Sequence, residues 1–202
     1  MGIDFFALKE YTYEYEVASF DGNTYTYNAN GIRISKNTNG VTHTYTLDGT
    51  KILREAWGNN TLVPLYDNED SVCGILYNNV PYYFIKNLQG DVVAIVAKNS
   101  QIIARYSYDV WGVPEIKSDS SDCRIATINP FRYRSYYYDE EIGLYYLQSR
   151  YYNANIGRFA NTDKVIGSND DHAAYALFSY CGNSPISRCD NGGFFWKKSL
   201  MV

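Results

Sequence analysis

A repeat of about twenty residues runs through the first half of the chain and restricts its fold more than any other feature. Each copy has aromatic or apolar residues, then Asp, Asn or Gln, and usually a glycine soon after. The copies are Tyr25–Gly31, Tyr45–Gly49, Leu65–Asn68, Asn87–Gly90 and Tyr106–Gly112. Measured at positions 27, 47, 66, 88 and 108, just before the Asp, Asn or Gln, the steps are 20, 19, 22 and 20 residues. A repeat of this length decides the architecture, because each copy is one structural unit.

Each copy predicts a β-hairpin. Tyrosine favours strands, Asp or Asn caps a turn, and glycine supplies the positive φ with which the chain reverses. Ile32–Lys36 and Lys51–Arg54 are the expected second strands. Residues 91–105, rich in β-branched residues and divided by Lys98–Ser100, predict one more hairpin. A single hairpin is marginally stable, so the sequence predicts an all-β fold in which stacked hairpins form a continuous sheet.

Composition supports β structure and argues against several classes of protein. The 202 residues include 22 tyrosines, and Tyr11 to Val17 alternate as in a half-buried strand. A net charge of −4 disfavours binding to nucleic acid or to an anionic membrane. Charged residues in the first twenty positions predict no signal peptide in this chain, and no apolar run reaches the ~18 residues of a membrane span.

The cysteines and histidines predict no metal or cofactor site. The four cysteines match no zinc-binding spacing: Cys73, Cys123, Cys181 and Cys189. We expect free thiols, with a disulfide between Cys181 and Cys189 as the alternative. His43 and His172 lie far apart in the sequence, which disfavours a His-based catalytic triad or metal site.

A polar run at Lys117–Asp122 predicts the end of the repeat array. We expect a hairpin array at residues 1–117, a loop at 118–128, a compact segment at 129–193 and a tail at 194–202. Near the C-terminus, Asp171–Phe178 predicts a short helix, and Cys181–Pro185 and Asp190–Gly193 predict turns.

The segment Asn129–Asp163 reads NPFRYRSYYYDEEIGLYYLQSRYYNANIGRFANTD and predicts two tight hairpins in succession. Arg132, Arg134 and Arg150 alternate with its tyrosines. Such a stripe could bind a polyanion, or the guanidinium groups could stack on rings across neighbouring strands. We favour the second, structural interpretation.

The Tyr-x-Tyr-Asp-x-x-Gly copies followed by this segment resemble the RHS (YD-repeat) proteins and their RHS repeat-associated core domain, over residues 25–193. The resemblance implies large bacterial proteins whose hairpins wind into a hollow, spiralling β-sheet shell, with the core domain plugging or rimming one end. It also implies that the shell encloses a C-terminal effector, commonly a toxin used against neighbouring cells. The core domain of such proteins can cut the chain between shell and effector at an aspartyl-protease-like site.

Three residues of this chain match the residues of that site. Arg158 and Asp163 match the family's GRFxxxD element, and Asp190 matches the aspartate of its terminal motif, although Asn191 stands where that motif has proline. Peptide hydrolysis by carboxylates needs two of them sharing a proton. Asp163 and Asp190 would supply the pair, and Arg158 would stabilise a carboxylate or the developing oxyanion. The alternative is structural: both aspartates cap turns and Arg158 pairs with one of them.

Three functions follow as hypotheses. The first is the C-terminal part of a shell scaffold that encapsulates and delivers a polymorphic toxin, with the rest of the shell and a C-terminal effector as partners. The second is a self-cleaving core domain, and the third is a module that binds glycans on cell surfaces. Cleavage after Gly193 would release only residues 194–202, so we expect the effector to be missing from this chain. As part of a longer protein, the chain would be secreted or exposed at a cell surface.

Overall fold

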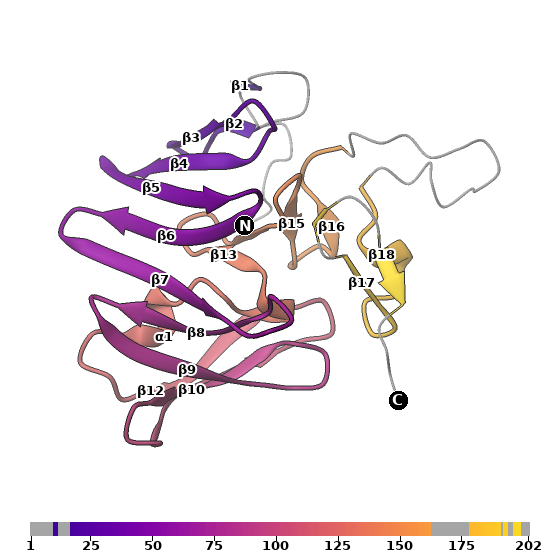
Figure 1. Cartoon of the computed structure of the whole chain (residues 1–202). Coiled ribbons are helices and arrows are strands. Elements are labelled where there is room, and N and C mark those ends of the chain that lie inside the picture. Colours follow the sequence, from indigo (N-terminus) through magenta and orange to yellow (C-terminus); the bar gives the residue numbers. More distant parts are fainter. Residues whose placement is uncertain (1–9, 12–16, 163–177, 191, 194–195, 199–202) are drawn as a thin grey trace.

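A computed structural model describes residues 10–11, 17–162, 178–190, 192–193 and 196–198 (Figure 1). These residues form three antiparallel sheets, of twelve, four and two strands. The large sheet consists of β1 (Glu10–Tyr11), β2 (Val17–Phe20), β3 (Asn23–Tyr27), β4 (Arg33–Thr38), β5 (Val41–Asp48), β6 (Lys51–Trp57), β7 (Asn60–Tyr66), β8 (Val72–Tyr77), β9 (Val80–Lys86), β10 (Val92–Ala97), β11 (Ile102–Tyr108) and β12 (Pro114–Asp119). The four-stranded sheet consists of β13 (Tyr137–Asp139), β14 (Leu144–Tyr146), β15 (Tyr151–Asn153) and β16 (Arg158–Phe159). The third sheet pairs β17 (Arg188–Asp190) with β18 (Trp196–Lys198).

The twelve strands pair strictly in sequence order, which confirms the prediction of stacked hairpins. The second strands expected after the first two repeat turns are β4 and β6, and the hairpin expected at residues 91–105 is β10 with β11. The strand expected from Tyr11 to Val17 lies largely outside the described residues, as does the helix expected at Asp171–Phe178.

The repeat turns all lie at the same ends of the strands. We call this side of the large sheet the repeat-turn edge, as distinct from the edge strands β1 and β12. Four of them share one geometry, in which the side-chain oxygen of an Asp or Asn accepts hydrogen bonds from the backbone N–H groups two and four residues later. The four residues are Asn28, Asp67, Asn87 and Asp109. The fourth copy is therefore anchored at Asn87 and not at Gln89, which corrects its alignment by two residues. The second copy is a two-residue turn, Gly49–Thr50, between the paired residues Asp48 and Lys51.

A β-bulge follows these turns in five hairpins and was not predicted. In each, the strand after the turn contains one residue without a cross-strand partner: Ile34, Leu53, Cys73, Val93 and Lys117. A bulge bends its strand and increases the local twist. Bulges repeated near one edge therefore give the large sheet its curvature.

One face of the curved sheet packs against the segment that follows it. A single cluster of buried side chains joins strand residues such as Leu62, Ile75 and Ile95 to Phe131 and Tyr146 of the later segment. Figure 1 shows β13 and β15 lying beside the large sheet, on the side opposite its free outer face. The hairpin array and the compact segment therefore share one hydrophobic core.

The compact segment folds into the two predicted hairpins, β13 with β14 and β15 with β16. Cross-strand pairs of aromatic residues dominate its register, including Tyr137 with Tyr146 and Tyr152 with Phe159. A second buried cluster, which includes Tyr145, Tyr152 and Tyr180, lies on its other side. The four-stranded sheet is thus buried on both faces.

The segment expected to be an exposed loop at residues 118–128 has more structure than predicted. Strand β12 extends to Asp119, and helix α1 (Ile125–Ile128) begins with two fully buried residues, Ile125 and Ala126. The polar run supplies the cap, because Ser121 Oγ and Asp119 Oδ2 accept the backbone N–H groups of Ile125 and Ala126 at 2.8 Å.

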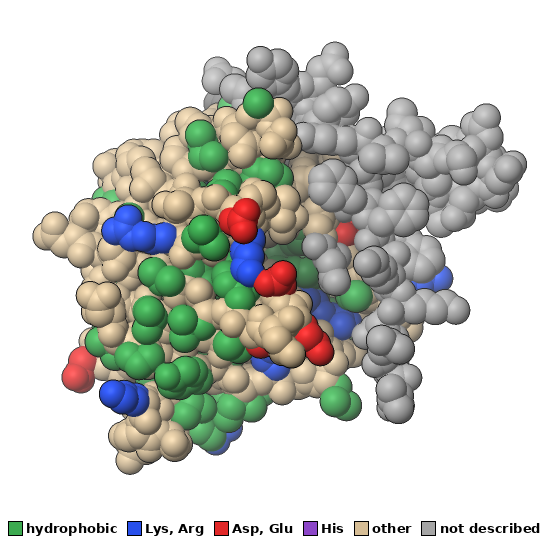
Figure 2. Space-filling model, in the orientation of Figure 1, with side chains coloured by type: hydrophobic (Ala, Val, Ile, Leu, Met, Phe, Trp, Pro, Cys, Tyr) green, Lys and Arg blue, Asp and Glu red, His purple; other side chains and the backbone are tan. Residues whose placement is uncertain are grey.

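The free face of the large sheet carries apolar as well as polar side chains (Figure 2). Ile34 and Leu53, the extra residues of two bulges, are exposed, as are Tyr83 and Ile85 on β9. None of the helices that the structure describes is long and apolar enough to cross a membrane.

Candidate functional site

A buried group of charged residues joins the large sheet to the compact segment. The carboxylate of Asp139, at the end of β13, is fully buried. It accepts hydrogen bonds from Arg33 at 2.5 and 3.1 Å and from Lys36 at 2.8 Å. Lys36 also forms an ion pair with Glu141 at 2.7 Å. Charges removed from water have to be paired, so this contact holds the two parts of the molecule in one register.

The bulge at Ile34 explains how two cations of one strand reach the same carboxylate. Arg33 and Lys36 are three residues apart and would face opposite sides of a regular strand. Because Ile34 is the extra residue between the pairs Thr26–Ser35 and Tyr27–Arg33, both cations face inward. Ile34 itself is exposed.

Tyrosine rings surround the Arg33 guanidinium. Its carbon lies between 4.3 and 5.8 Å from the centroids of five rings, those of Tyr25, Tyr45, Tyr137, Tyr146 and Tyr151. The ring faces are electron-rich and favour the cation in a site without water. Burial alone would raise the pKa of Asp139, but Arg33 and Lys36 outweigh this effect and hold the pKa below its usual value.

A second polar contact lies further along the repeat-turn edge. Asp91 accepts the backbone N–H of Arg134 at 2.9 Å, and Ser135 Oγ donates to the carbonyl of Gly90. The Arg134 guanidinium donates to the carbonyls of Gln89 and Pro185. The compact segment is therefore fixed to the repeat-turn edge at two places, through the Arg33 group and through Asp91.

Asp190, one of the predicted site residues, is buried on β17. Its Oδ1 accepts the backbone N–H of Gly193 at 2.8 Å and that of Gly192 at 3.3 Å, as expected of a residue that caps the final turn. Its Oδ2 lies 3.1 Å from the guanidinium of Arg150. Arg150 also donates from Nε to the carbonyl oxygen of Gly193.

The structure does not bring Arg158 to Asp190. Arg158 lies on β16 with an exposed side chain, and the guanidinium beside Asp190 is that of Arg150. Asp163, the third predicted residue, lies outside the described residues. Of the two candidate carboxylates, only Asp190 is described by the structure, and the arginine that contacts it is Arg150.

The interpretation of the other arginines as structural agrees with their contacts. The guanidinium carbons lie over aromatic rings, Arg132 over Tyr138 at 4.5 Å and Arg150 over Phe159 at 3.6 Å. All four cysteines are free, so the predicted thiols are present and the alternative disulfide is not. Burial raises the pKa of the Cys181 thiol to about 12.

Sequence reasoning missed Arg33, Lys36 and Arg150 as site residues. Arg33 is 106 residues from Asp139 and Arg150 is 40 residues from Asp190, so no local pattern connects them. The one available signal was the segment Ile32–Lys36, a predicted strand of the repeat array that carries two cations, Arg33 and Lys36. Among the described residues, no group of three or more His, Cys, Asp or Glu side chains could hold a metal ion.

The model of the Teneurin YD-shell family matches residues 50–186. The chain is 36% identical over 178 residues to the tRNA nuclease WapA of Bacillus subtilis, covering 86% of this chain and 8% of that protein. It is 39% identical over 83 residues to the toxin protein Tse5 of Pseudomonas aeruginosa, covering 41% of this chain and 6% of Tse5. The chain thus spans less than a tenth of the length of these relatives.

Solved structures share the fold. The crystal structure of TcdB2-TccC3-TEV superposes with a TM-score of 0.67 at 20% identity, covering 85% of this chain and 9% of that chain. The Photorhabdus luminescens Tc holotoxin pore superposes with a TM-score of 0.63 at 18% identity, covering 92% of this chain and 10% of that chain. The family model matches more than half of the chain. The alignment to WapA, at 36% identity, covers 86% of the chain. The chain therefore belongs to the Teneurin YD-shell family of RHS (YD-repeat) proteins.

Proposed function

We propose that this chain is the C-terminal section of an RHS-type shell that encloses and delivers a C-terminal toxin effector. The observation that carries the proposal is the buried contact between Arg33, Lys36 and Asp139, which fixes the compact segment against the inner face of the repeat sheet. A segment held in this way would cover the inner face of the shell where the shell ends, which supports the proposal. Two relatives, WapA and Tse5, are named as a nuclease and a toxin.

The two edge strands of the large sheet, β1 and β12, support a position of this chain at one end of the shell. The edge strand β12 begins with Pro114 and carries Glu115 and Lys117, and such residues discourage a further strand from pairing. The sheet would therefore continue past β1, where upstream repeats would pair. The complete protein would act outside the cell that makes it, either secreted or at the cell surface.

Protease protection in the complete protein tests the proposal. The gene product that contains this chain with its upstream and downstream sequence would be digested with thermolysin, and the fate of the region beyond residue 193 followed by mass spectrometry. We expect that region to resist digestion, and Asp139→Asn to make it sensitive. Asp70→Asn removes an exposed ion pair with Lys51 and should leave protection unchanged. Digestion as fast as that of the separately produced effector would contradict encapsulation.

Self-cleavage after Gly193 is a second candidate, favoured by the contact between Arg150 and the Gly193 carbonyl oxygen. A guanidinium at that oxygen would polarise the carbonyl and stabilise negative charge as water adds to its carbon. Asp190 would be one of two carboxylates, with Asp163 as the other candidate, one taking a proton from water and one giving a proton to the leaving nitrogen. The C–N bond between Gly193 and Phe194 would break.

Intact-mass measurement of the purified chain tests self-cleavage directly. We expect a fragment ending at Gly193 to accumulate, and Arg150→Lys and Asp190→Asn to prevent it. Arg158→Lys, at an exposed position, is the matched control and should cleave at the normal rate. A single full-length species over several days would exclude cleavage in this chain.

A further inference from the structure

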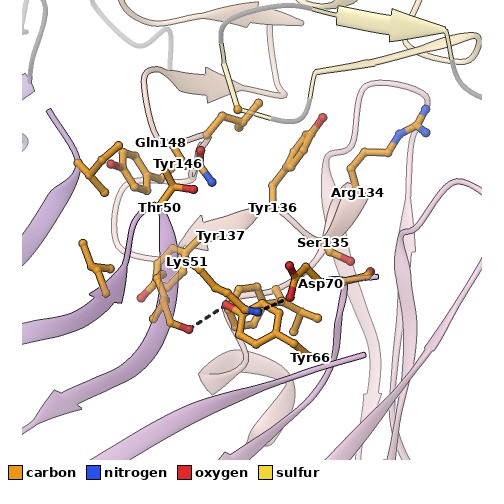
Figure 3. A pocket seen from close by; sticks show the side chains of 18 of the residues that line it. Thr50, Lys51, Tyr66, Asp70, Arg134, Ser135, Tyr136, Tyr137, Tyr146 and Gln148 are labelled. Atoms are coloured by element: carbon orange, nitrogen blue, oxygen red, sulfur yellow. Dashed lines mark hydrogen bonds and ion pairs between the residues drawn. The ribbon is translucent and has the colours of Figure 1, made fainter. Parts of the chain in front are cut away.

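The final turn of the compact segment is docked on one loop of the same segment. The loop Leu147–Arg150 connects β14 to β15, and the turn Asp190–Gly193 lies against it. Gln148 of the loop and Gly192 of the turn line one wall of a cavity of about 530 Å³ between the repeat-turn edge and the compact segment (Figure 3). The turn therefore lies between the loop and an open space.

The loop binds two consecutive carbonyl groups of the turn. Ser149 donates to the carbonyl oxygen of Gly192, from Oγ at 2.8 Å and from its backbone N–H at 3.4 Å. Arg150 donates from Nε to the carbonyl oxygen of Gly193. Asp190 accepts the backbone N–H groups of both glycines. The protein thus holds both N–H groups and both carbonyl oxygens of this glycine pair.

Gly193 lies too close to the loop for any side chain to fit. Its φ is +72°, and a Cβ there would lie 2.5 Å from Ser149 Oγ, 2.7 Å from the Leu147 carbonyl oxygen and 3.1 Å from the backbone nitrogen of Arg150. A serine side chain can rotate away, but the two backbone atoms can move only if the loop shifts. The requirement for glycine therefore comes from the loop as well as from the turn.

The loop itself has a strained backbone. Gln148 has φ +61°, and the Ser149 N–H also donates to the Leu147 carbonyl at 2.6 Å, which closes a three-residue γ-turn. A γ-turn with positive φ at its centre is rare and strained, and backbone strain persists where the surrounding structure fixes it. Asn161 contributes by donating from Nδ2 to the Ser149 carbonyl at 3.4 Å. The loop is therefore held in the shape that receives the turn.

We propose that the loop Leu147–Arg150 is a specificity site that accepts only glycine at position 193, with Ser149 as a positioning residue. The proposal rests on self-cleavage after Gly193, the second candidate function above, and names the feature that selects the peptide bond. Ser149 fixes the carbonyl of Gly192 and thereby keeps the next carbonyl on the Arg150 guanidinium, where negative charge would develop. A side chain at position 193 would displace that carbonyl.

Cleavage rates of substituted chains test the specificity, with intact mass followed over time. Gly143→Ala is the matched control for Gly193→Ala, because Gly143 has a similar φ of +67° but a Cβ there would meet only the Tyr138 hydroxyl, at 3.6 Å. We expect Gly193→Ala to slow cleavage about a hundredfold, which is the cost of a displacement of about 1 Å. Gly143→Ala should cleave at the natural rate.

The positioning role of Ser149 is tested by loss and rescue of its hydroxyl group. Ser149→Ala should slow cleavage about tenfold, since one hydrogen bond to the turn is lost. Ser149→Thr keeps the hydroxyl group and should restore most of the rate. A merely structural residue would lower the unfolding temperature in Ser149→Ala and leave the rate unchanged at temperatures where the chain is folded.

Amide hydrogen exchange separates docking of the turn from the chemistry. It would be measured for residues 190–193 in an Asp163→Asn background, which removes one of the two candidate carboxylates. We expect slow exchange there, exchange about tenfold faster or more when Gly193→Ala is added, and no change with Gly143→Ala. A natural chain that never cleaves would contradict self-cleavage, and exchange alone would then decide whether the loop requires glycine. The proposal is overturned if Gly193→Ala cleaves at the natural rate or leaves the exchange unchanged.

Discussion

At the scale of single residues, the inward face of β4 reverses the usual arrangement of apolar and charged side chains. Arg33 and Lys36 are buried at 2% and 4% exposure, while Ile34 between them is 38% exposed. This is tolerated because Asp139 and Glu141 neutralise the two cations and tyrosine rings enclose Arg33. A buried ion pair adds little net stability, but it strongly opposes any arrangement that separates its members.

Asp139→Asn should lower the free energy of unfolding by about 3–5 kcal/mol, because Arg33 and Lys36 would remain buried without their shared counter-charge. Urea denaturation followed by circular dichroism measures the change. The double variant Arg33→Met with Asp139→Leu should recover part of the loss, since it removes both charges. A loss below about 1 kcal/mol in Asp139→Asn would show that water reaches the cluster.

The Asp139 carboxylate should make the free energy of unfolding depend on pH. Its pKa in the folded chain is below the unfolded value of about 3.9, so its contribution is fully present above that value. The contribution is lost as the pH falls from about 4 through the lower folded pKa. Denaturation curves between pH 2 and 7 should show this loss for the natural chain, and a smaller loss for Asp139→Asn. Parallel curves for the two proteins would contradict the assignment.

At the scale of elements, each repeat combines a turn held by an Asp or Asn side chain with a bulge in the strand that follows. The turns could be predicted because Asp or Asn followed by glycine acts locally. The bulges could not, because an unpartnered residue is defined by the pairing of two strands. For the same reason the sequence could not indicate that Arg150 contacts Asp190, because the two residues meet only through the tertiary fold.

Two glycines of turns distinguish local from tertiary requirements. Gly157 has φ +63°, and a Cβ there would lie 2.7 Å from the ring of Trp111, which belongs to the last repeat. Gly49 has a similar φ of +59° with no atom within 4 Å of such a Cβ. Gly157→Ala should therefore cost about 2–4 kcal/mol, and Gly49→Ala only about 1–2 kcal/mol. Thermal and urea unfolding measure both, and equal costs would show that Trp111 moves aside freely.

At the scale of the whole molecule, the repeat sheet and the compact segment share one hydrophobic core. The sequence predicted hairpins in both parts and a boundary between them near residue 118. It could not show that they share a core, because the inward residues of the sheet, such as Tyr45 and Ile75, are covered by residues far along the chain. An alternating strand pattern indicates which face is buried but not what buries it.

This shared core makes a prediction about truncation. A fragment of residues 17–120 retains the strands from β2 to β12 but loses everything that covers their inner face, including Phe131, Tyr137 and Tyr146. The uncovered face would present Leu62, Ile75 and other apolar side chains to water, together with Arg33 and Lys36 without Asp139. We expect this fragment to bind the dye ANS and to lose cooperative thermal unfolding, whereas the full chain should show one transition without dye binding.

Addition of a separately produced 121–202 fragment should restore the transition, and the Asp139→Asn form of that fragment should restore it less well. A 17–120 fragment that unfolds cooperatively by itself would show that the hairpin array is an independent domain, to which the compact segment is merely attached.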